Sequence, residues 1–225
     1  MFNNDYVMRM IEQLSRAIAK IVGLKDENKL DESQEMLNFT LTGFIGLNSH
    51  TIDSLDYEGF IRIISANGGL NANKCVMLSE LLKLKAELYT ARGEDGAFDL
   101  YIKSLNLYLE ALLDDESLRA EPHSGRVNAL IDIVREYRLP ENTLRLLFRY
   151  YELTGQFGKA EDRLFELLET TEYHREIILS GVAFYDRLLH RNGIELARGN
   201  LPMDEVMEGR EKLISRLTHL NAAFL

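Results

Sequence analysis

Three polar side chains, Asn142, Arg145 and Arg149, are the best candidates for binding chemistry in this sequence. Arg145 lies three residues after Asn142 and four before Arg149, so a helix would place all three side chains together. The apolar residues Leu144 and Leu147 mark the opposite side of that helix. A guanidinium group binds a carboxylate through two parallel hydrogen bonds, so the pair of arginines predicts recognition of an acidic group. Ordinary solvated charges with neighbouring Glu partners are the simpler alternative.

Motifs for catalysis or for a cofactor are not found. The sequence has no His-Glu-x-x-His pair, no Gly-x-Ser-x-Gly elbow, no paired cysteines and no dinucleotide-binding fingerprint. The histidines, at positions 50, 123, 174, 190 and 219, lack the spacing that directs two imidazoles at one metal from a helix. We therefore expect no catalytic residue, no cofactor and no metal. Acidic side chains that folding brings together stay open as an alternative.

Two segments resemble ligand-binding loops only superficially. The acidic stretch from Asp26 to Glu35 has Leu30 where a calcium loop needs an oxygen ligand, and no loop glycine follows. In the Gly-rich stretch ANGGLNANK, Lys74 is followed by Cys75 and not by the Ser or Thr of a phosphate-binding loop. Solvated acids in the first stretch and a turn at Asn67–Gly69 in the second are the expected structures.

Composition narrows the class of protein. The chain has 225 residues, of which 46% are hydrophobic and 28% charged, and its formal net charge is −10. An acidic surface repels a phosphate backbone, so nucleic acid is not an expected partner. Charged residues interrupt the apolar positions near the N-terminus, so neither a signal peptide nor a membrane span is expected, and the predicted location is cytoplasmic. The single Cys75 is expected to pack as a small hydrophobe, with a reactive thiol as the alternative.

The candidate residues belong to a predicted helical hairpin over residues 144–168. Gly155 supplies the turn between its two helices. Apolar residues recur at helical spacing on both sides of this glycine, at Leu144, Leu147, Phe148 and Tyr151 and then at Phe157, Ala160, Leu164, Leu167 and Leu168. The candidate polar residues would therefore lie on the first helix of a helix–turn–helix unit.

The remaining elements are also predicted to be helices. Periodicity and turn signals place them at about 7–22, within 25–47, within 52–64 from a start near Asp53 or Asp56, and at 73–92, 97–113, 123–134, 172–193 and 203–220. Pro122, Pro140 and Pro202 are expected at helix starts. Gly181 is expected to permit close backbone approach, and Gly209 to cost its helix roughly 1 kcal/mol relative to Ala.

The hairpin resembles one tetratricopeptide unit in its order of Tyr, turn Gly, turn aromatic and Ala. Tyr89, Gly93, Tyr108 and Ala111 repeat that order in a degenerate copy. The resemblance implies an all-α fold of antiparallel helical hairpins, stacked into a right-handed superhelix or α-solenoid with irregular repeats. We expect a single domain over 1–225, with N-terminal helices at 1–70, degenerate hairpins at 71–171 and C-terminal capping helices at 172–225.

In tetratricopeptide arrays the first helix of each unit lines a concave groove. The resemblance therefore implies a peptide-binding groove at the same positions in this chain. Its lining would be Asn142, Arg145, Arg149 and Glu152, with Lys83 and Glu87 as looser equivalents in the earlier copy.

Three longer strings carry a second resemblance. NNDYVMRMIEQLSRAIAKIVGL near the N-terminus, GGLNANKCVMLSELLKLKAELY in the centre and the later YLEALL resemble an uncharacterised family of small bacterial tetratricopeptide-like proteins that contain a domain of unknown function. The resemblance is strongest up to about Leu113. It brings no known activity and no catalytic residue to this chain.

The expected function is that of a non-enzymatic scaffold that binds a protein or peptide. A self-associating homo-oligomer is the alternative. Its contact would be the N-terminal amphipathic helix or the aromatic region of Phe148, Tyr150 and Tyr151. An enzyme is the third class, which a deep pocket with convergent polar side chains would favour.

Overall fold

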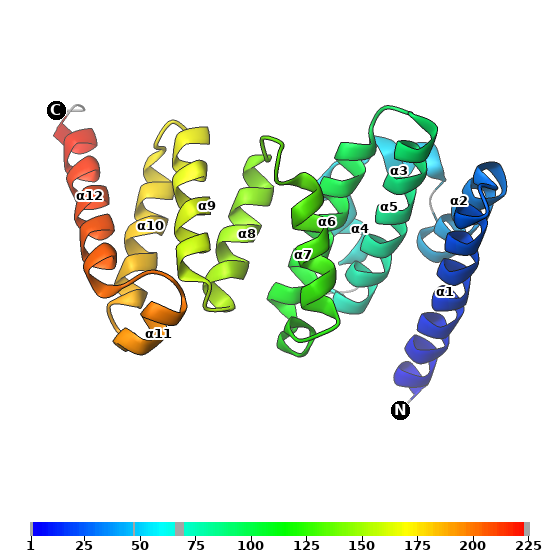
Figure 1. The fold of residues 1–225 in the computed structure, drawn as a ribbon, viewed down its shortest axis with the longest axis horizontal. Coiled ribbons are helices and arrows are strands. Elements are labelled where there is room, and N and C mark those ends of the chain that lie inside the picture. Colours follow the sequence, from blue (N-terminus) through cyan, green and yellow to red (C-terminus); the bar gives the residue numbers. More distant parts are fainter. Residues whose placement is uncertain (1, 47, 66–69, 223–225) are drawn as a thin grey trace. The chain divides into compact units, whose positions relative to one another are not determined.

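The computed structural model describes residues 2–46, 48–65 and 70–222, and this part of the chain is entirely helical, without a strand (Figure 1). The predicted all-α class is confirmed. The chain divides into two compact units, residues 1–137 (unit 1) and 138–225 (unit 2), and the boundary falls inside the predicted 71–171 segment. The expectation of a single domain stays a prediction.

Unit 1 is built around two long helices, α5 (Ala72–Arg92) and α6 (Ala97–Asp114), which form a hairpin. The other helices of unit 1 are α1 (Phe2–Asp26), α2 (Leu30–Ile45), α3 (Ser49–Ser54), α4 (Tyr57–Ile64), the 3-10 helix η1 (Glu116–Arg119) and α7 (His123–Val134). Gly93 ends α5 in the left-handed conformation, with φ +68°, as its position in the sequence predicted.

Two buried serines link the two helices of the α5–α6 hairpin. The hydroxyl groups of Ser79 and Ser104 each donate to the other residue's backbone carbonyl at 2.8 Å, so the two helices approach closely at this point. Helix α5 packs against α6, α2 and α1, and it is buried around most of its circumference. Three neighbouring helices therefore leave α5 with little exposed surface.

The segment 52–64, predicted to contain one short helix that starts near Asp53 or Asp56, contains the end of α3 and all of α4. Leu55 and Asp56 between them are extended, and the Asp56 side chain accepts a hydrogen bond from the backbone N–H of Gly59 at 2.7 Å. Asp56 is thus the N-cap of α4. The predicted helix start near Asp56 is confirmed, and α3 is an additional short helix that the pattern did not predict. The predicted turn at Asn67–Gly69 lies outside the described residues.

Helix α1 packs its apolar stripe on α2 and α5, as its periodicity predicted. Leu14 and Ile21 are buried, and Ile18 and Val22 are partly buried against the same core. The predicted stripe also includes Val7 and Ile11, whose side chains lie outside the described part of the structure. Within unit 1, the hydroxyl of Ser33 on α2 donates to the carbonyl of Ile21 at 2.9 Å and sets the register of the α1–α2 pair.

All three prolines precede a helix, as predicted. Pro122 comes before α7, Pro140 before α8 (Glu141–Leu153) and Pro202 before α12 (Met203–Ala222). A proline fits a helix start because its missing N–H would have no partner there and its φ is already close to the helical value.

Unit 2 continues from α8 with α9 (Phe157–Thr170), α10 (Arg175–Leu188), α11 (Gly193–Arg198) and α12. The α8–α9 pair is the predicted hairpin, and Gly155 makes the turn with φ +71°. Helix α10 packs on α9 and α12, side by side with them in Figure 1. The sequence analysis missed α11, whose start is set by a hydrogen bond from the N–H of Glu195 to the side chain of Asn192 at 2.9 Å.

Two helical glycines in unit 2 make room for packed side chains. A Cβ on Gly181 would lie 2.5 Å from Leu213 and 3.0 Å from Leu164, so the predicted close approach is confirmed. A Cβ on Gly209 would lie 2.3 Å from the hydroxyl oxygen of the buried Tyr185. Gly209 is therefore required for packing. The sequence had predicted only that this glycine lowers the stability of its helix relative to Ala.

Candidate functional site

Helix α8 places the predicted polar trio on one side of unit 2. Asn142 and Arg149 are exposed, and neither side chain makes a hydrogen bond or an ion pair within the described part of the chain. Arg145 lies between them and is partly buried. The opposite side of α8 carries Leu144 and Leu147, which are buried. Amphipathic spacing therefore positions the trio as the sequence predicted.

Two of the candidate residues are paired with α10. Arg145 makes ion pairs with Glu141 at 2.7 Å on its own helix and with Glu176 at 3.3 Å on α10. Glu152 accepts two hydrogen bonds from Arg187, at 2.6 Å from Nε and 2.8 Å from an amino nitrogen. The hydrogen bonds that Arg187 donates to Glu152 keep the pKa of Arg187 above its usual value. These two candidates thus have the carboxylate or arginine partners that the simpler interpretation expected.

These contacts show that α8 and α10 run in the same direction. Arg145 meets Glu176 near the start of both helices, Phe148 packs on Phe184 with ring centroids 5.2 Å apart, and the Glu152–Arg187 pair lies near their ends. The sequence offsets of the three contacts are 31, 36 and 35 residues. Helix α9, between them in the sequence, runs in the opposite direction. We call the surface formed by Asn142, Arg149 and the two ion pairs the α8–α10 face.

A surface hollow lies beside the Glu152–Arg187 pair. Its volume is about 360 Å³, and buried side chains of Phe157 and Leu188 form its floor. His190 and Arg191 complete the lining, so the rim is basic. The hollow offers an apolar floor next to positive charge. Sequence reasoning missed it because Phe157 and Leu188 come from different helices.

The two earlier-copy candidates, Lys83 and Glu87, belong to α5 in unit 1. Glu87 makes an ion pair with Lys25 of α1 and a weaker one with Lys83 at 3.8 Å. All three side chains are partly buried. This pairing connects α5 to α1. Lys83 and Glu87 are therefore engaged within unit 1, whereas Asn142, Arg145, Arg149 and Glu152 belong to unit 2.

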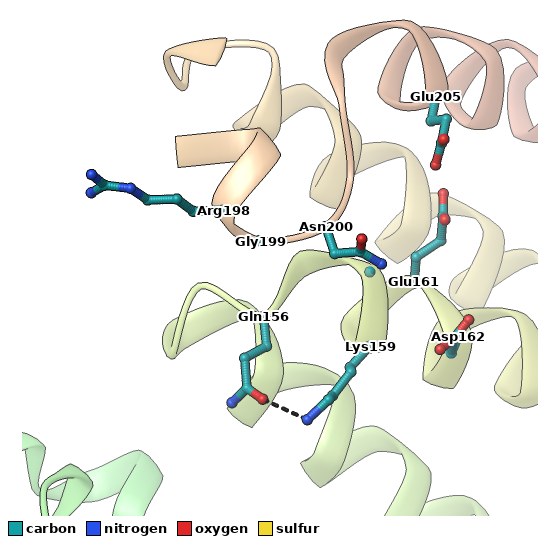
Figure 2. A pocket seen from close by; sticks show the side chains of 9 residues that line it. Gln156, Lys159, Glu161, Asp162, Arg198, Gly199, Asn200 and Glu205 are labelled. Carbon is teal, nitrogen blue, oxygen red and sulfur yellow. Dashed lines mark hydrogen bonds between the residues drawn. The ribbon is translucent and has the colours of Figure 1, made fainter. Parts of the chain in front are cut away.

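A second polar pocket in unit 2 lies between the start of α9 and the α11–α12 connection (Figure 2). It measures about 530 Å³. Figure 2 shows Glu161 and Glu205 facing each other across it, Lys159 beside Gln156, and Arg198 directed away from the other side chains. Burial raises the pKa of the Glu161 carboxyl. The negative charges of Glu205 and Asp162 raise this pKa further, and the hydrogen bond that Tyr185 donates to Glu161 opposes them. Opposite charges line this pocket without converging on one point.

Two glycines bring the backbone together at this pocket. The N–H of Gly158 donates to the carbonyl of Gly199 at 2.8 Å. A Cβ on Gly158 would lie 2.5 Å from the Asn200 carbonyl oxygen, and one on Gly199 would lie 2.6 Å from the Gly155 carbonyl oxygen. The pocket is thus a product of close packing between the α9 start and the α11–α12 connection.

Unit 1 contains a buried charge cluster that the sequence analysis missed. Lys85 of α5 is fully buried, forms an ion pair with Asp53 of α3 and donates to the Ser49 carbonyl at 3.2 Å. Tyr89 donates to the same carboxylate at 3.0 Å, and Lys103 of α6 donates to the Asp53 carbonyl at 2.8 Å. We call these residues the Lys85 cluster. Nothing in the apolar period of α5 marks position 85 as buried.

Burial dominates the electrostatics of the Lys85 cluster. It lowers the pKa of the Lys85 ammonium and raises the pKa of Tyr89 to about 12. The hydrogen bond that Lys85 donates to Asp53 opposes the lowering of the Lys85 pKa, and the neighbouring positive charge of Lys103 reinforces it. The two lysines hold both the side chain and the backbone carbonyl of Asp53, so the cluster fastens the short helix α3 to α5 and α6.

Other features of the described residues add no reactive site. Cys75 is fully buried, which raises its pKa to about 12 and confirms its predicted packing role. Among the described residues, no three His, Cys, Asp or Glu side chains are grouped as metal ligands. Helices with enough length and apolar character to cross a bilayer are absent from the same residues.

Comparison with known proteins places the chain in a family. A model of a family of unknown function, DUF6483, matches residues 1–218. The match extends well beyond Leu113, where the sequence resemblance was strongest. The searches of curated proteins and of solved structures returned no match. The chain therefore belongs to DUF6483, a family of unknown function.

Proposed function

We propose that this protein is a tetratricopeptide-like helical-repeat scaffold that binds a carboxylate-bearing peptide or protein segment along the α8–α10 face of unit 2. The observation that carries the proposal is the pair of exposed side chains of Asn142 and Arg149 on this face, which have no partner among the described residues. They lie on either side of the anchored Arg145.

The helix arrangement supports the scaffold part of the proposal. Helices α8 and α10 are parallel neighbours whose contacts are offset by 31 to 36 residues, close to the period of about 34 that a tetratricopeptide repeat has. Parallel first helices in successive units are what creates a shared binding face in such arrays. The α8–α10 face corresponds to that position.

The polar chemistry supports the ligand class. Arg149 has five N–H donors and no acidic partner in the described chain, so a carboxylate of a partner would gain charge-assisted hydrogen bonds without breaking an existing pair. Asn142 can donate and accept for a peptide backbone. The hollow over Phe157 and Leu188 would take an apolar side chain of the same segment.

The direct test is binding to an array of synthetic peptides that share one length and differ in their Asp and Glu content. We expect the whole protein to retain acidic peptides with apolar residues. Arg149→Glu should weaken binding of a retained peptide by at least about tenfold in fluorescence anisotropy, because a charge-assisted pair becomes a repulsion.

Arg62→Glu is the matched control. Arg62 is an exposed arginine of α4 in unit 1, and its substitution changes the net charge by the same amount. It should leave the affinity unchanged, and circular dichroism should show the same helicity for both variants. The α8–α10 face would be rejected as the site if the protein retained no acidic peptide. It would also be rejected if Arg149→Glu and the unsubstituted protein bound a peptide with equal affinity.

A further inference from the structure

Helices α1 and α2 leave a hollow on the surface of unit 1. Its volume is about 600 Å³, and it lies between the two helices over Leu14, Ala17, Gly43 and Phe44. Arg9, Gln13 and Thr40 add polar lining. Gly43 has no neighbour within 4 Å of where a Cβ would be, so space is open at this point of α2.

Phe39 lines the same hollow and is the most exposed large hydrophobic side chain in the described residues, at 77%. An exposed phenylalanine forgoes the stabilisation that burial of an aromatic ring supplies. The same surface thus carries both an aromatic projection and an apolar hollow next to it. Two such surfaces related by a two-fold axis can each receive the other's projection.

The charges on this surface are also self-complementary. On α2 the charged residues are all acidic, and Glu35 is exposed without a partner in the described chain. Glu32 is also exposed and interacts electrostatically with Lys29 just before the helix. On α1, Arg16 and Lys20 are exposed on the neighbouring helix, and Arg16 makes only a weak pair with Glu12 at 3.7 Å. One helix of the surface is therefore cationic and the other anionic over the same stretch.

The register of the hairpin aligns these features. The Ser33–Ile21 hydrogen bond places Lys20 of α1 at about the level of Glu35 of α2, and Ala17 and Phe39 line the same hollow. A two-fold axis parallel to the helices would lay α1 of one copy over α2 of the other at the same level. Phe39 would then meet the partner's hollow, and Lys20 the partner's Glu35.

We infer that the α1–α2 surface binds a second copy of this chain through a two-fold interface, with Phe39 of each copy in the hollow of the other. This inference does not depend on peptide binding, because α1 and α2 belong to unit 1 and the α8–α10 face belongs to unit 2. It deepens the alternative of self-association through the N-terminal helix by naming the surface that pairs.

Light scattering coupled to gel filtration, over a range of protein concentrations, tests the interface. The unsubstituted chain should approach twice its mass of 25.9 kDa as concentration rises. Phe39→Glu should raise the dissociation constant by roughly a hundredfold, because a charge replaces the central aromatic contact. Ile194→Glu is the control, since Ile194 is 68% exposed on α11 in unit 2 and should leave the dimer intact.

A charge reversal gives a second, independent readout. Lys20→Glu should weaken the dimer, and Lys20→Glu combined with Glu35→Lys should restore it, because the pair is exchanged across the interface. Circular dichroism should show unchanged helicity for every variant. The inference would be overturned if the unsubstituted chain stayed monomeric at all concentrations or if the dimer survived Phe39→Glu. It would also be overturned if the double variant dimerised as weakly as Lys20→Glu.

Discussion

Units 1 and 2 differ in where they keep their polar side chains. Among the described residues, six of the seven buried polar or charged side chains belong to unit 1, including Lys85 and Lys103, and only Thr143 belongs to unit 2. In unit 2 several arginines pair with carboxylates at or near the surface, as Arg187 does with Glu152. The same all-helical architecture is thus stabilised in two ways.

The cause of this difference is the number of helices that cover each central helix. Neighbours on several sides bury α5, so positions that a simple amphipathic helix would leave in water are inside and need internal partners. In contrast, α8 keeps one exposed side, and Asn142 and Arg149 remain on it. A helix that is buried all round must satisfy its polar side chains within the protein, whereas a half-buried helix can present them to a ligand.

The net charge also differs between the two units. Unit 1 contains 14 Lys and Arg against 22 Asp and Glu, a net charge of −8, whereas unit 2 contains 12 against 14, a net charge of −2. Unit 1 repels an acidic segment more strongly than unit 2 does. The nearly neutral unit is therefore the better location for a carboxylate-binding face.

The largest effect is expected from breaking the Lys85 cluster. Asp53→Ala leaves a fully buried ammonium without its carboxylate, with the Ser49 carbonyl as the remaining hydrogen-bond acceptor among the described residues, and should lower the stability of α5 by about 3 kcal/mol. Lys85→Met should cost less, about 1 kcal/mol, because Asp53 is 37% exposed and water can solvate it. Hydrogen–deuterium exchange of the α5 amides measures both, because it reports local stability in unit 1.

Asp99→Ala is the control for that prediction. Asp99 pairs with Lys103 at 2.7 Å but is 63% exposed, so its loss should cost less than about 1 kcal/mol. If Asp53→Ala costs no more than Asp99→Ala, the buried charges do not distinguish unit 1 from unit 2.

A medium effect is expected from adding one methyl group to a helix in each unit. Gly209→Ala in α12 should destabilise unit 2 by about 2 kcal/mol, because the new Cβ would overlap the buried Tyr185 ring. Gly23→Ala in α1 should stabilise its helix by about 0.5 to 1 kcal/mol, because nothing lies within 4 Å of the new atom. Chemical denaturation followed by circular dichroism should show shifts of opposite sign, and shifts of one sign would contradict the packing role of Gly209.

The smallest effect is expected from Glu161 and depends on pH. Its pKa in the folded protein lies above 4.5, chiefly through burial, so the folded state retains this proton more strongly than the unfolded state. The stability that this group contributes is therefore complete below pH 4.5 and is lost as pH rises through the folded pKa.

Glu161→Gln imitates the protonated acid and keeps an oxygen that accepts from Tyr185. The variant should be more stable than the unsubstituted protein at neutral pH, and the difference should vanish below pH 4.5 in thermal unfolding. Glu169→Gln, an exposed position on the same helix, should show no such pattern. A difference that stays constant with pH would contradict the assignment.

Several boundaries of the fold were predictable from local signals. Pro122, Pro140 and Pro202 mark helix starts, and Gly93 and Gly155 end helices, because backbone conformation at these residues is restricted or permitted by their own covalent structure. Asp56 was one of two predicted starts for the helix within 52–64, and its side chain caps α4. The short helix α3 before it was not predicted.

The candidate site was predictable only in part. Helical spacing correctly placed Asn142, Arg145 and Arg149 on the side of α8 opposite Leu144 and Leu147. It did not show that Arg145 is held by Glu176, which is 31 residues away in sequence. Spacing within one helix describes which side chains share a side, but not which of them a neighbouring helix engages.

The sequence by itself determined the helical class, most helix ends and the polar side of α8, because these depend on periodicity and on residues close in the chain. Only the tertiary structure decided that Lys85 is buried with Asp53, that Gly209 admits Tyr185 and that Phe39 remains exposed beside a hollow. These outcomes depend on which helices pack together, because burial is a property of neighbours and not of the residue alone.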